Sequence, residues 1–165
     1  MPNWIEGTMK LRGKRGDISR FIHEGIHGYD YIGENERPKN EYLRDSSTED
    51  ELYCEIYNDP HIDGTRRMFI TDTSAFMTVE EGVCCFNVRA AWAFISNDKD
   101  KDNLIAIADK YSVDIRLFGV ERGMEFIEEV IVHHGHGSEK GKIKLDNCIS
   151  YEDWDWECPF PKMGG

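Results

Sequence analysis

Residues 98–126 constrain the fold most, because helix period, strand period and turn chemistry agree there. One apolar stripe recurs with helical spacing at Leu104, Ile107, Ala108 and Tyr111. After Ser112, apolar residues at 113, 115 and 117 alternate with their neighbours, as in a strand buried on one face. We expect that strand to end at Gly119. This unit predicts a sheet with helices packed on one face.

The segments around this unit complete the predicted architecture. Residues 7–13 alternate as a first strand, and a helix of about three turns is expected from Asp17, a suitable N-cap, until Gly25 and Gly28 weaken it. We expect residues 66–71 and 83–92 to form one hairpin, and residues 126–132 and 140–145 a second. The order predicts an α+β fold: a ferredoxin-like antiparallel sheet with two helices on one face and an extra hairpin.

The length of 165 residues fits one domain over residues 1–165. Residues 27–63 are polar, with one possible strand at 51–57, and we interpret them as an insertion in the ferredoxin-like domain. Residues 150–165 carry Trp154, Trp156 and Phe160 among acidic residues. The C-terminal tail is too aromatic for a solvated segment, so we expect it to pack on the body.

The composition limits the classes of function. The chain has 32 acidic and 20 basic residues and a formal charge of −12, which opposes nonspecific attraction to a phosphate backbone. Such a surface either imitates nucleic acid or is simply solvated. Five cysteines without a C-x-x-C pair indicate neither a disulfide framework nor a zinc ribbon. With no basic and apolar leader and no long apolar run, we expect a cytoplasmic protein without a membrane partner.

Strand alternation divides the predicted sheet into an apolar and a basic face. The face under the helices would carry Met9, Leu11, Met68, Ile70, Phe86, Val88, Ile115 and Leu117. The opposite face would carry Lys10, Arg12, Arg67, Phe69, Asn87, Arg89, Arg116 and Phe118. Bases stack on exposed rings and arginines contact phosphates in RNA-recognition sheets. This face is therefore a candidate nucleic-acid-binding surface, unless the acidic aromatic tail covers it.

A metal-binding pattern occurs near the predicted first helix. Residues 23–27 match H-E-x-x-H, in which two imidazoles one helical turn apart hold zinc and the glutamate is the general base. The ligands would be His23 and His27, with Glu24 as base and Glu34 or Glu36 as the nearest further carboxylate. Because glycines interrupt the helix that a zinc site needs, we expect no bound metal and no zinc hydrolase here.

Two further groups of residues could cleave RNA. His133, His134 and His136 stand in the predicted second hairpin turn, where imidazoles could bind a metal or transfer a proton near a 2′-hydroxyl, although the turn alone explains the glycines beside them. The acidic insertion could hold Mg²⁺ for phosphodiester hydrolysis or form a solvated loop. The catalytic candidates are Glu34, Glu36, His134 and His136.

Four short segments stand out as motifs: Asn3-Trp4, Gly7-Thr8, Ala91-Trp92 and residues 111–126. They resemble the YubB-type ferredoxin-like family of phages and plasmids. In that family a strand ending in Ala-Trp precedes a helix, a Tyr-Gly turn, a strand and a Glu-x-Gly-x-x-Phe segment. This sequence has Ser112 for the glycine and Arg122 inside the last motif. The motifs are structural, so the resemblance implies a fold and carries no catalytic residue.

Residues 3–13 and 156–161, with Gly164-Gly165, are also similar to small proteins of mobile elements, among them anti-CRISPR proteins against type II effectors. This resemblance implies a counter-defence protein that engages or truncates the guide RNA of an RNA-guided nuclease. No cofactor is expected, apart from Mg²⁺ if the protein is a metal-dependent ribonuclease. The alternative is a noncatalytic acidic module that mimics nucleic acid and blocks a basic cleft of a host protein. The sequence leaves the oligomeric state open.

Overall fold

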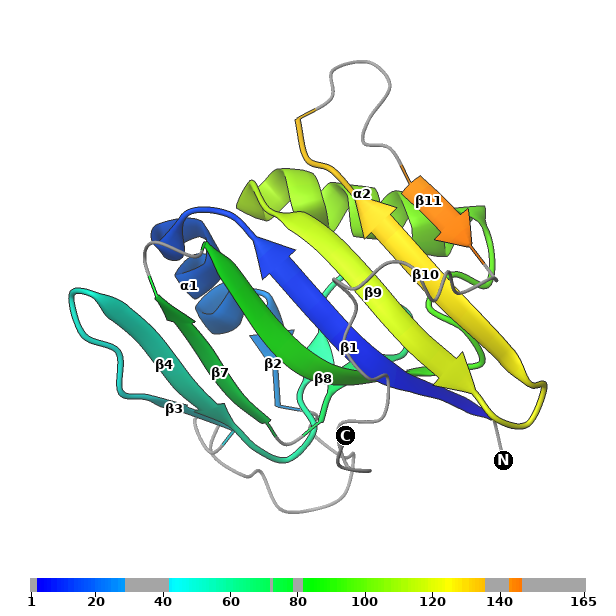
Figure 1. The fold of residues 1–165 in the computed structure, drawn as a ribbon, viewed down its shortest axis with the longest axis horizontal. Coiled ribbons are helices and arrows are strands. Elements are labelled where there is room, and N and C mark those ends of the chain that lie inside the picture. The colour runs from blue at the N-terminus through cyan, green and yellow to red at the C-terminus, as the bar shows by residue number, and fades with distance from the viewer. Residues whose placement is uncertain (1–2, 29–41, 72, 79–81, 136–142, 147–165) are drawn as a thin grey trace, which may run out of the picture.

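The computed structural model describes residues 3–28, 42–71, 73–78, 82–135 and 143–146. The described residues form a mixed α/β fold with a mostly antiparallel sheet and two helices, and Figure 1 shows both helices on the same side of the large sheet. In chain order the elements are β1 (Trp4–Arg12), α1 (Arg15–Glu24), β2 (Ile26–His27), β3 (Leu43–Asp45), β4 (Glu51–Ile56), β5 (His61–Ile62), β6 (Met68–Ile70), β7 (Thr73–Thr78), β8 (Val83–Ala91), α2 (Asp98–Tyr111), β9 (Asp114–Glu121), β10 (Phe126–Val132) and β11 (Ile143–Asp146).

The strands form two sheets. The large sheet has the order β11-β10-β9-β1-β8-β6-β5-β2, and the small one has the order β3-β4-β7. Both predicted hairpin pairings are present, because β6 pairs antiparallel with β8 and β10 pairs antiparallel with β11. The first hairpin differs from the prediction in that β7 lies between its two strands in the chain and pairs with β4 instead.

Strand β1 lies at the centre of the large sheet, between β8 and β9. It begins at Trp4, three residues before the predicted start, and Gly7 lies opposite Gly119 of β9. A Cβ atom on Gly7 would lie 1.9 Å from the carbonyl oxygen of Phe118, so β1 and β9 are too close at this position for a side chain. The prediction that the strand after α2 ends at Gly119 was wrong, since β9 continues to Glu121 and pairs there with Ile5.

Helix α2 follows the sequence prediction closely. Asn97 caps its start by accepting a hydrogen bond from the backbone N–H of Asp100 at 3.0 Å. The predicted stripe at positions 104, 107, 108 and 111 is buried. Ser112 ends the helix in the left-handed conformation with φ of 55°, which turns the chain into β9.

Helix α1 has the predicted length of about three turns but a different start. It begins at Arg15, and Lys14 occupies the N-cap position without a side-chain hydrogen bond. The prediction that Asp17 is the N-cap was therefore wrong; Asp17 lies in the first turn and pairs with Arg20 at 3.3 Å. A negatively charged side chain in the first turn still interacts favourably with the positive end of the helix dipole. The helix ends where Gly25 donates its N–H to the carbonyl of Phe21.

One hydrophobic core joins both helices and both sheets. Phe21 of α1 makes edge contacts with Phe86 of β8 and with Tyr111 of α2, at ring-centre distances of 6.2 and 5.4 Å. Leu52 and Ile56 of the small sheet belong to the same core. The predicted insertion therefore contributes to the core where it is described. Among the described residues, neither helix has the length and apolar content needed to cross a membrane.

Candidate nucleic-acid interface

The two faces of the large sheet divide as strand alternation predicts. All eight residues expected under the helices are buried, at 2% exposure or less: Met9, Leu11, Met68, Ile70, Phe86, Val88, Ile115 and Leu117. The residues between them in the strands, among them Arg12, Phe69, Arg89 and Arg116, therefore project from the opposite face. We call the side of the large sheet away from α1 and α2 the open face, a name that refers to the two helices alone.

Aromatic rings and guanidinium groups gather on the open face across β1, β8 and β6, which are neighbours in this order in the sheet. The guanidinium carbons of Arg89 and Arg67 lie 5.1 and 5.6 Å from the ring centre of Trp4. Phe69 packs edge-on against Trp4 at 6.1 Å and against His61 at 5.3 Å, and Arg89 lies 6.0 Å from the Phe69 ring. Trp4, His61, Arg67, Phe69 and Arg89 are hereafter called the ring cluster. These distances are those of cation–π and edge-to-face contacts.

Most arginines of the open face are paired with carboxylates. Arg12 pairs with Asp114 at 2.6 Å and Arg116 with Glu129 at 2.8 Å. Arg89 of the ring cluster pairs with Asp59 at 2.7 Å. The face is therefore less basic than the sequence pattern predicted, because acids from neighbouring strands and loops neutralise these arginines.

Arg67 differs from the other arginines of the open face. It is exposed, it leads into β6, and no ion pair of Arg67 occurs within the described part of the chain. Its guanidinium group lies over Trp4 while much of the side chain contacts solvent. Arg67 is thus the cation of the ring cluster best placed to contact a phosphate.

The second predicted stacking ring, Phe118, is not exposed. It pairs with Thr8 in the middle of the sheet, and the exposed fractions of the two residues are only 7% and 6%. Phe118 therefore offers too little ring surface for a base to stack, which corrects the prediction. The predicted packing of the tail, residues 150–165, lies outside the described residues.

The H-E-x-x-H residues do not share a helical face. Helix α1 ends at Glu24, and His27 lies in β2. His23 pairs through Nε2 with Asp45 at 2.8 Å, whereas His27 pairs through Nε2 with Asp63 at 2.7 Å. Because the two imidazoles have separate partners, the arrangement lacks the geometry of a helical zinc site.

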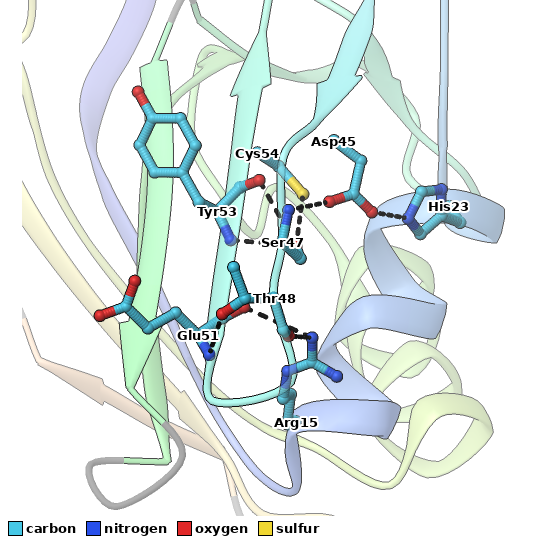
Figure 2. Close-up of polar contacts among 8 residues, drawn as sticks. All are labelled: Arg15, His23, Asp45, Ser47, Thr48, Glu51, Tyr53 and Cys54. Carbon is cyan, nitrogen blue, oxygen red and sulfur yellow. Dashed lines mark hydrogen bonds and ion pairs between the residues drawn. The ribbon is translucent and has the colours of Figure 1, made fainter.

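The contact of His23 with Asp45 belongs to a network that joins α1 to the turn between β3 and β4 (Figure 2). Asp45 accepts a hydrogen bond from the backbone N–H of Ser47 at 2.8 Å, and the guanidinium group of Arg15 donates to the carbonyls of Thr48 and Glu51. Burial acts to raise the pKa of Asp45, but hydrogen bonds from Ser47 and His23 outweigh it and lower the pKa to about 2. These contacts hold the turn between β3 and β4 against α1.

Cys54 lies beside this network but is not an activated nucleophile. Its Sγ atom is 4.0 Å from Oγ of Ser47, and the side chain is buried. Burial, with the nearby charge of Asp45, raises the pKa of the thiol to about 11. A thiol with this pKa stays protonated at neutral pH and attacks poorly.

The predicted catalytic candidates fall in different places. Glu34, Glu36 and His136 lie outside the described residues. His134 is described and contacts Asp114, with Nδ1 at 2.9 Å from Oδ1. No group of three metal-ligating side chains is present in residues 3–28, 42–71, 73–78, 82–135 and 143–146.

Sequence reasoning missed two members of the ring cluster. Trp4 was missed because the first strand was expected to begin at residue 7, although the alternation of β1 extends back to Trp4. His61 lies in a strand of two residues, which is too short to show a period.

Comparisons with protein-family models, with curated proteins and with solved structures find no match to this chain. The structure shows a mixed α/β protein with the ring cluster on its open face.

Proposed function

We propose that this protein binds single-stranded RNA on the open face, with the ring cluster as the main contact. The observation that supports this most is the approach of two guanidinium groups, those of Arg67 and Arg89, to the single ring of Trp4 at 5.6 and 5.1 Å. Proteins that bind single strands without sequence preference combine aromatic stacking with cations that follow the backbone. Trp4 and Phe69 are the stacking rings, and Arg67 is the phosphate contact.

The ion pairs on the open face determine the character of this binding. Because Arg12, Arg89 and Arg116 are each held by a carboxylate, few phosphates are neutralised. Stacking therefore contributes more of the affinity than charge does, at about 1–3 kcal/mol for each stacked base. The dependence of binding on salt is then shallow, because it follows the number of neutralised phosphates.

We also propose a ferredoxin-like core for this fold. The four strands β9-β1-β8-β6 are adjacent in this order, and their pairings are antiparallel. Together with α1 and α2 they follow the chain order strand, helix, strand, strand, helix, strand. The remaining strands of the large sheet are additions at its two edges. Aromatic residues of a four-stranded sheet also stack bases in RNA-recognition domains, which supports the proposed interface.

The proposed biological role is counter-defence in the cytoplasm of a bacterial host. It rests on the resemblance of residues 3–13 and 156–161, with Gly164-Gly165, to small proteins of mobile elements. The RNA would be the guide RNA of a type II RNA-guided nuclease, which this protein engages before or after the effector assembles.

Two observations favour a second function. The formal charge is −12, and the arginines of the open face are largely neutralised by acids. A noncatalytic module that occupies a basic cleft of a host protein would use such a surface. It would bind the effector protein without RNA and would lose affinity steeply with salt.

Fluorescence anisotropy with labelled single-stranded RNA, with and without Mg²⁺, tests the proposal. We expect Trp4→Leu to weaken binding by about fivefold or more, and Trp4→Phe to retain most of it, because a stacked base contributes about 1–3 kcal/mol. Tyr57→Leu is the control, since Tyr57 directly follows strand β4 of the small sheet and its side chain is exposed, with a relative exposure of 40%. Equal affinities of Trp4→Leu and the wild type would reject the interface. Binding to the effector protein without RNA would establish the second function instead.

A further inference from the structure

A second group of titratable side chains lies at the other end of β1 from the ring cluster. Arg12 ends β1, Asp114 begins β9, and these two residues are opposite each other in the sheet. His133 and His134 follow the last residue of β10. Trp4 and Arg12 are separated by eight positions along β1, which corresponds to about 27 Å at about 3.4 Å per residue. A single RNA strand lying along β1 would contact both groups.

The carboxylate of Asp114 holds this group together. Its Oδ2 atom accepts hydrogen bonds from Nη2 and Nε of Arg12 at 2.6 and 3.1 Å. Its Oδ1 atom accepts from the backbone N–H of His134 at 3.2 Å and lies 2.9 Å from Nδ1 of the same residue. Nδ1 of His133 lies 3.4 Å from Oδ2. One carboxylate thus positions a guanidinium group and two imidazoles.

The ionisation of Asp114 fixes which nitrogen of His134 carries the proton. Burial acts to raise the pKa of the Asp114 carboxyl, but hydrogen bonds from Arg12, His134 and His133 outweigh it, so the pKa lies well below its ordinary value. An ionised carboxylate only accepts hydrogen bonds, so Nδ1 of His134 is the donor. In the neutral ring Nε2 then carries the lone pair and can take up a proton.

The reactive groups are accessible to a ligand. The exposed side-chain fractions are 39% for His134, 37% for His133 and 64% for Arg12. Arg12 contacts Asp114 through Nε and Nη2, which leaves Nη1 outside that ion pair. Two imidazoles and a guanidinium group can supply what acid–base cleavage of RNA uses: a base, an acid and a cation for the phosphate.

We propose that His133, His134 and Arg12 form a site that cleaves RNA by transesterification, a proposal that rests on the proposed RNA binding. One neutral imidazole takes the proton of a ribose 2′-hydroxyl, and the 2′-oxygen forms a bond to the adjacent phosphorus. The bond from phosphorus to the 5′-oxygen of the next nucleotide breaks, and that oxygen takes a proton from the other, protonated imidazole. Through Nη1, which lies outside the ion pair with Asp114, Arg12 stabilises the charge that develops on the phosphoryl oxygens. The products are a 2′,3′-cyclic phosphate and a 5′-hydroxyl.

This reaction has a defined pH dependence. It needs one neutral and one protonated imidazole at the same time, so the rate passes through a maximum with pH and falls on both sides. Among the residues that the structure describes, the charged groups near the two imidazoles are Arg12 of β1, Asp114 of β9 and Asp109 of α2, whose carboxylate accepts the N–H of Gly135 at 3.0 Å.

The test uses the full chain with a labelled single-stranded RNA in EDTA, and with the same RNA carrying 2′-O-methyl groups throughout. We expect cleavage of the first RNA only, with cyclic-phosphate ends, and a loss of about 100-fold or more in His134→Asn and in His133→Asn. His23→Asn is the matched control, because His23 is an exposed histidine paired with an aspartate, Asp45, on another part of the surface. It should cleave like the wild type.

Binding of the 2′-O-methyl RNA separates this inference from the proposed function. Binding without cleavage of the unmodified RNA overturns the site and leaves the interface standing, whereas no binding overturns both. Unchanged cleavage in the histidine variants, each shown by thermal melting to be folded, also rejects the site. Cleavage of the 2′-O-methyl RNA would exclude the transesterification step.

Discussion

Arg89 has two partners on the open face, since its guanidinium carbon lies 5.1 Å from the ring centre of Trp4 and its Nη2 atom lies 2.7 Å from the carboxylate of Asp59. Asp59 stands in a tight turn with φ of 46°, after Asn58 with φ of 62°. The turn places a negative charge beside the ring cluster. Asp59 therefore reduces the attraction of this surface for a phosphate while it orients the guanidinium group.

Removal of that negative charge should strengthen RNA binding. We expect Asp59→Asn to raise the affinity by about two- to tenfold, because Arg89 then meets a phosphate without an internal competitor. Asparagine tolerates the left-handed backbone at this position. The plot of log affinity against log salt should steepen by about 0.7, the value for one further phosphate of a single strand.

The control for this change is Glu55→Gln. Glu55 pairs with Arg44 at 3.6 Å on the small sheet, so the substitution releases an arginine far from the ring cluster in the sheet topology. An equal gain of affinity in both variants would show that net charge alone governs binding, and would contradict the proposed interface.

Acid should destabilise the wild type more steeply than Asp114→Asn. The pKa of Asp114 is lower in the folded chain than in the unfolded chain, so its contribution to stability is present above about pH 4 and is lost as pH falls further. The asparagine variant is less stable at neutral pH but lacks this loss. Urea unfolding between about pH 5 and pH 2 measures the difference. Parallel profiles for the two proteins would show that the three partners of Asp114 do not lower its pKa in the folded chain.

The close pairing of β1 with β9 should make any side chain at position 7 destabilising. An added Cβ would meet the carbonyl oxygen of Phe118 at 1.9 Å and the Cα of Gly119 at 2.5 Å. We expect Gly7→Ala to lower the free energy of unfolding by about 3 kcal/mol or more. Gly16→Ala is the matched control, since an added Cβ in this first turn of α1 meets nothing within 4 Å, and alanine should raise stability by up to about 1 kcal/mol. Equal melting temperatures would refute the steric account.

Glu128 should be required for the chain between β8 and α2. It is buried on the helix side of β10 and accepts the backbone N–H groups of Phe94 at 2.8 Å and Ile95 at 3.1 Å. Burial raises the pKa of this carboxyl, although the two N–H groups act against the shift. We expect Glu128→Ala to cost about 2–4 kcal/mol of unfolding free energy, because two donors lose their acceptor. Asp102→Ala, on the exposed side of α2, should change stability little, and a similar small change for Glu128→Ala would contradict this role.

The parts of the fold that sequence predicted are those with a sustained period. Helix α2 and strand β9 follow from the apolar stripe ending at Tyr111 and from the alternation after Ser112. The end of β9 could not be predicted, because Gly119 looks like a strand terminator until Gly7 is known to lie opposite it. The division of β6 from β7 also depends on tertiary structure, since β7 pairs with β4 from the predicted insertion.

The candidate interface could likewise be predicted only in part, where strand alternation shows which face of the sheet a residue lies on. Alternation placed Phe69 and Arg89 on the open face, but it gave no information about ion pairs. The partner of Arg89 comes from a turn 30 positions away in the sequence. Phe118 has the alternation of an exposed strand residue, yet it is buried at its place in the middle of the sheet. Burial and pairing of this kind depend on contacts that are distant in sequence.

Ultraviolet cross-linking of a single-stranded RNA to the protein, followed by mass spectrometry of the peptides, tests the central claim most directly. The account predicts that nucleotides are attached to peptides of β1 and β6, at Trp4 and Phe69. Cross-links confined to the small sheet β3-β4-β7, with the peptides of β1 and β6 unmodified, would contradict it.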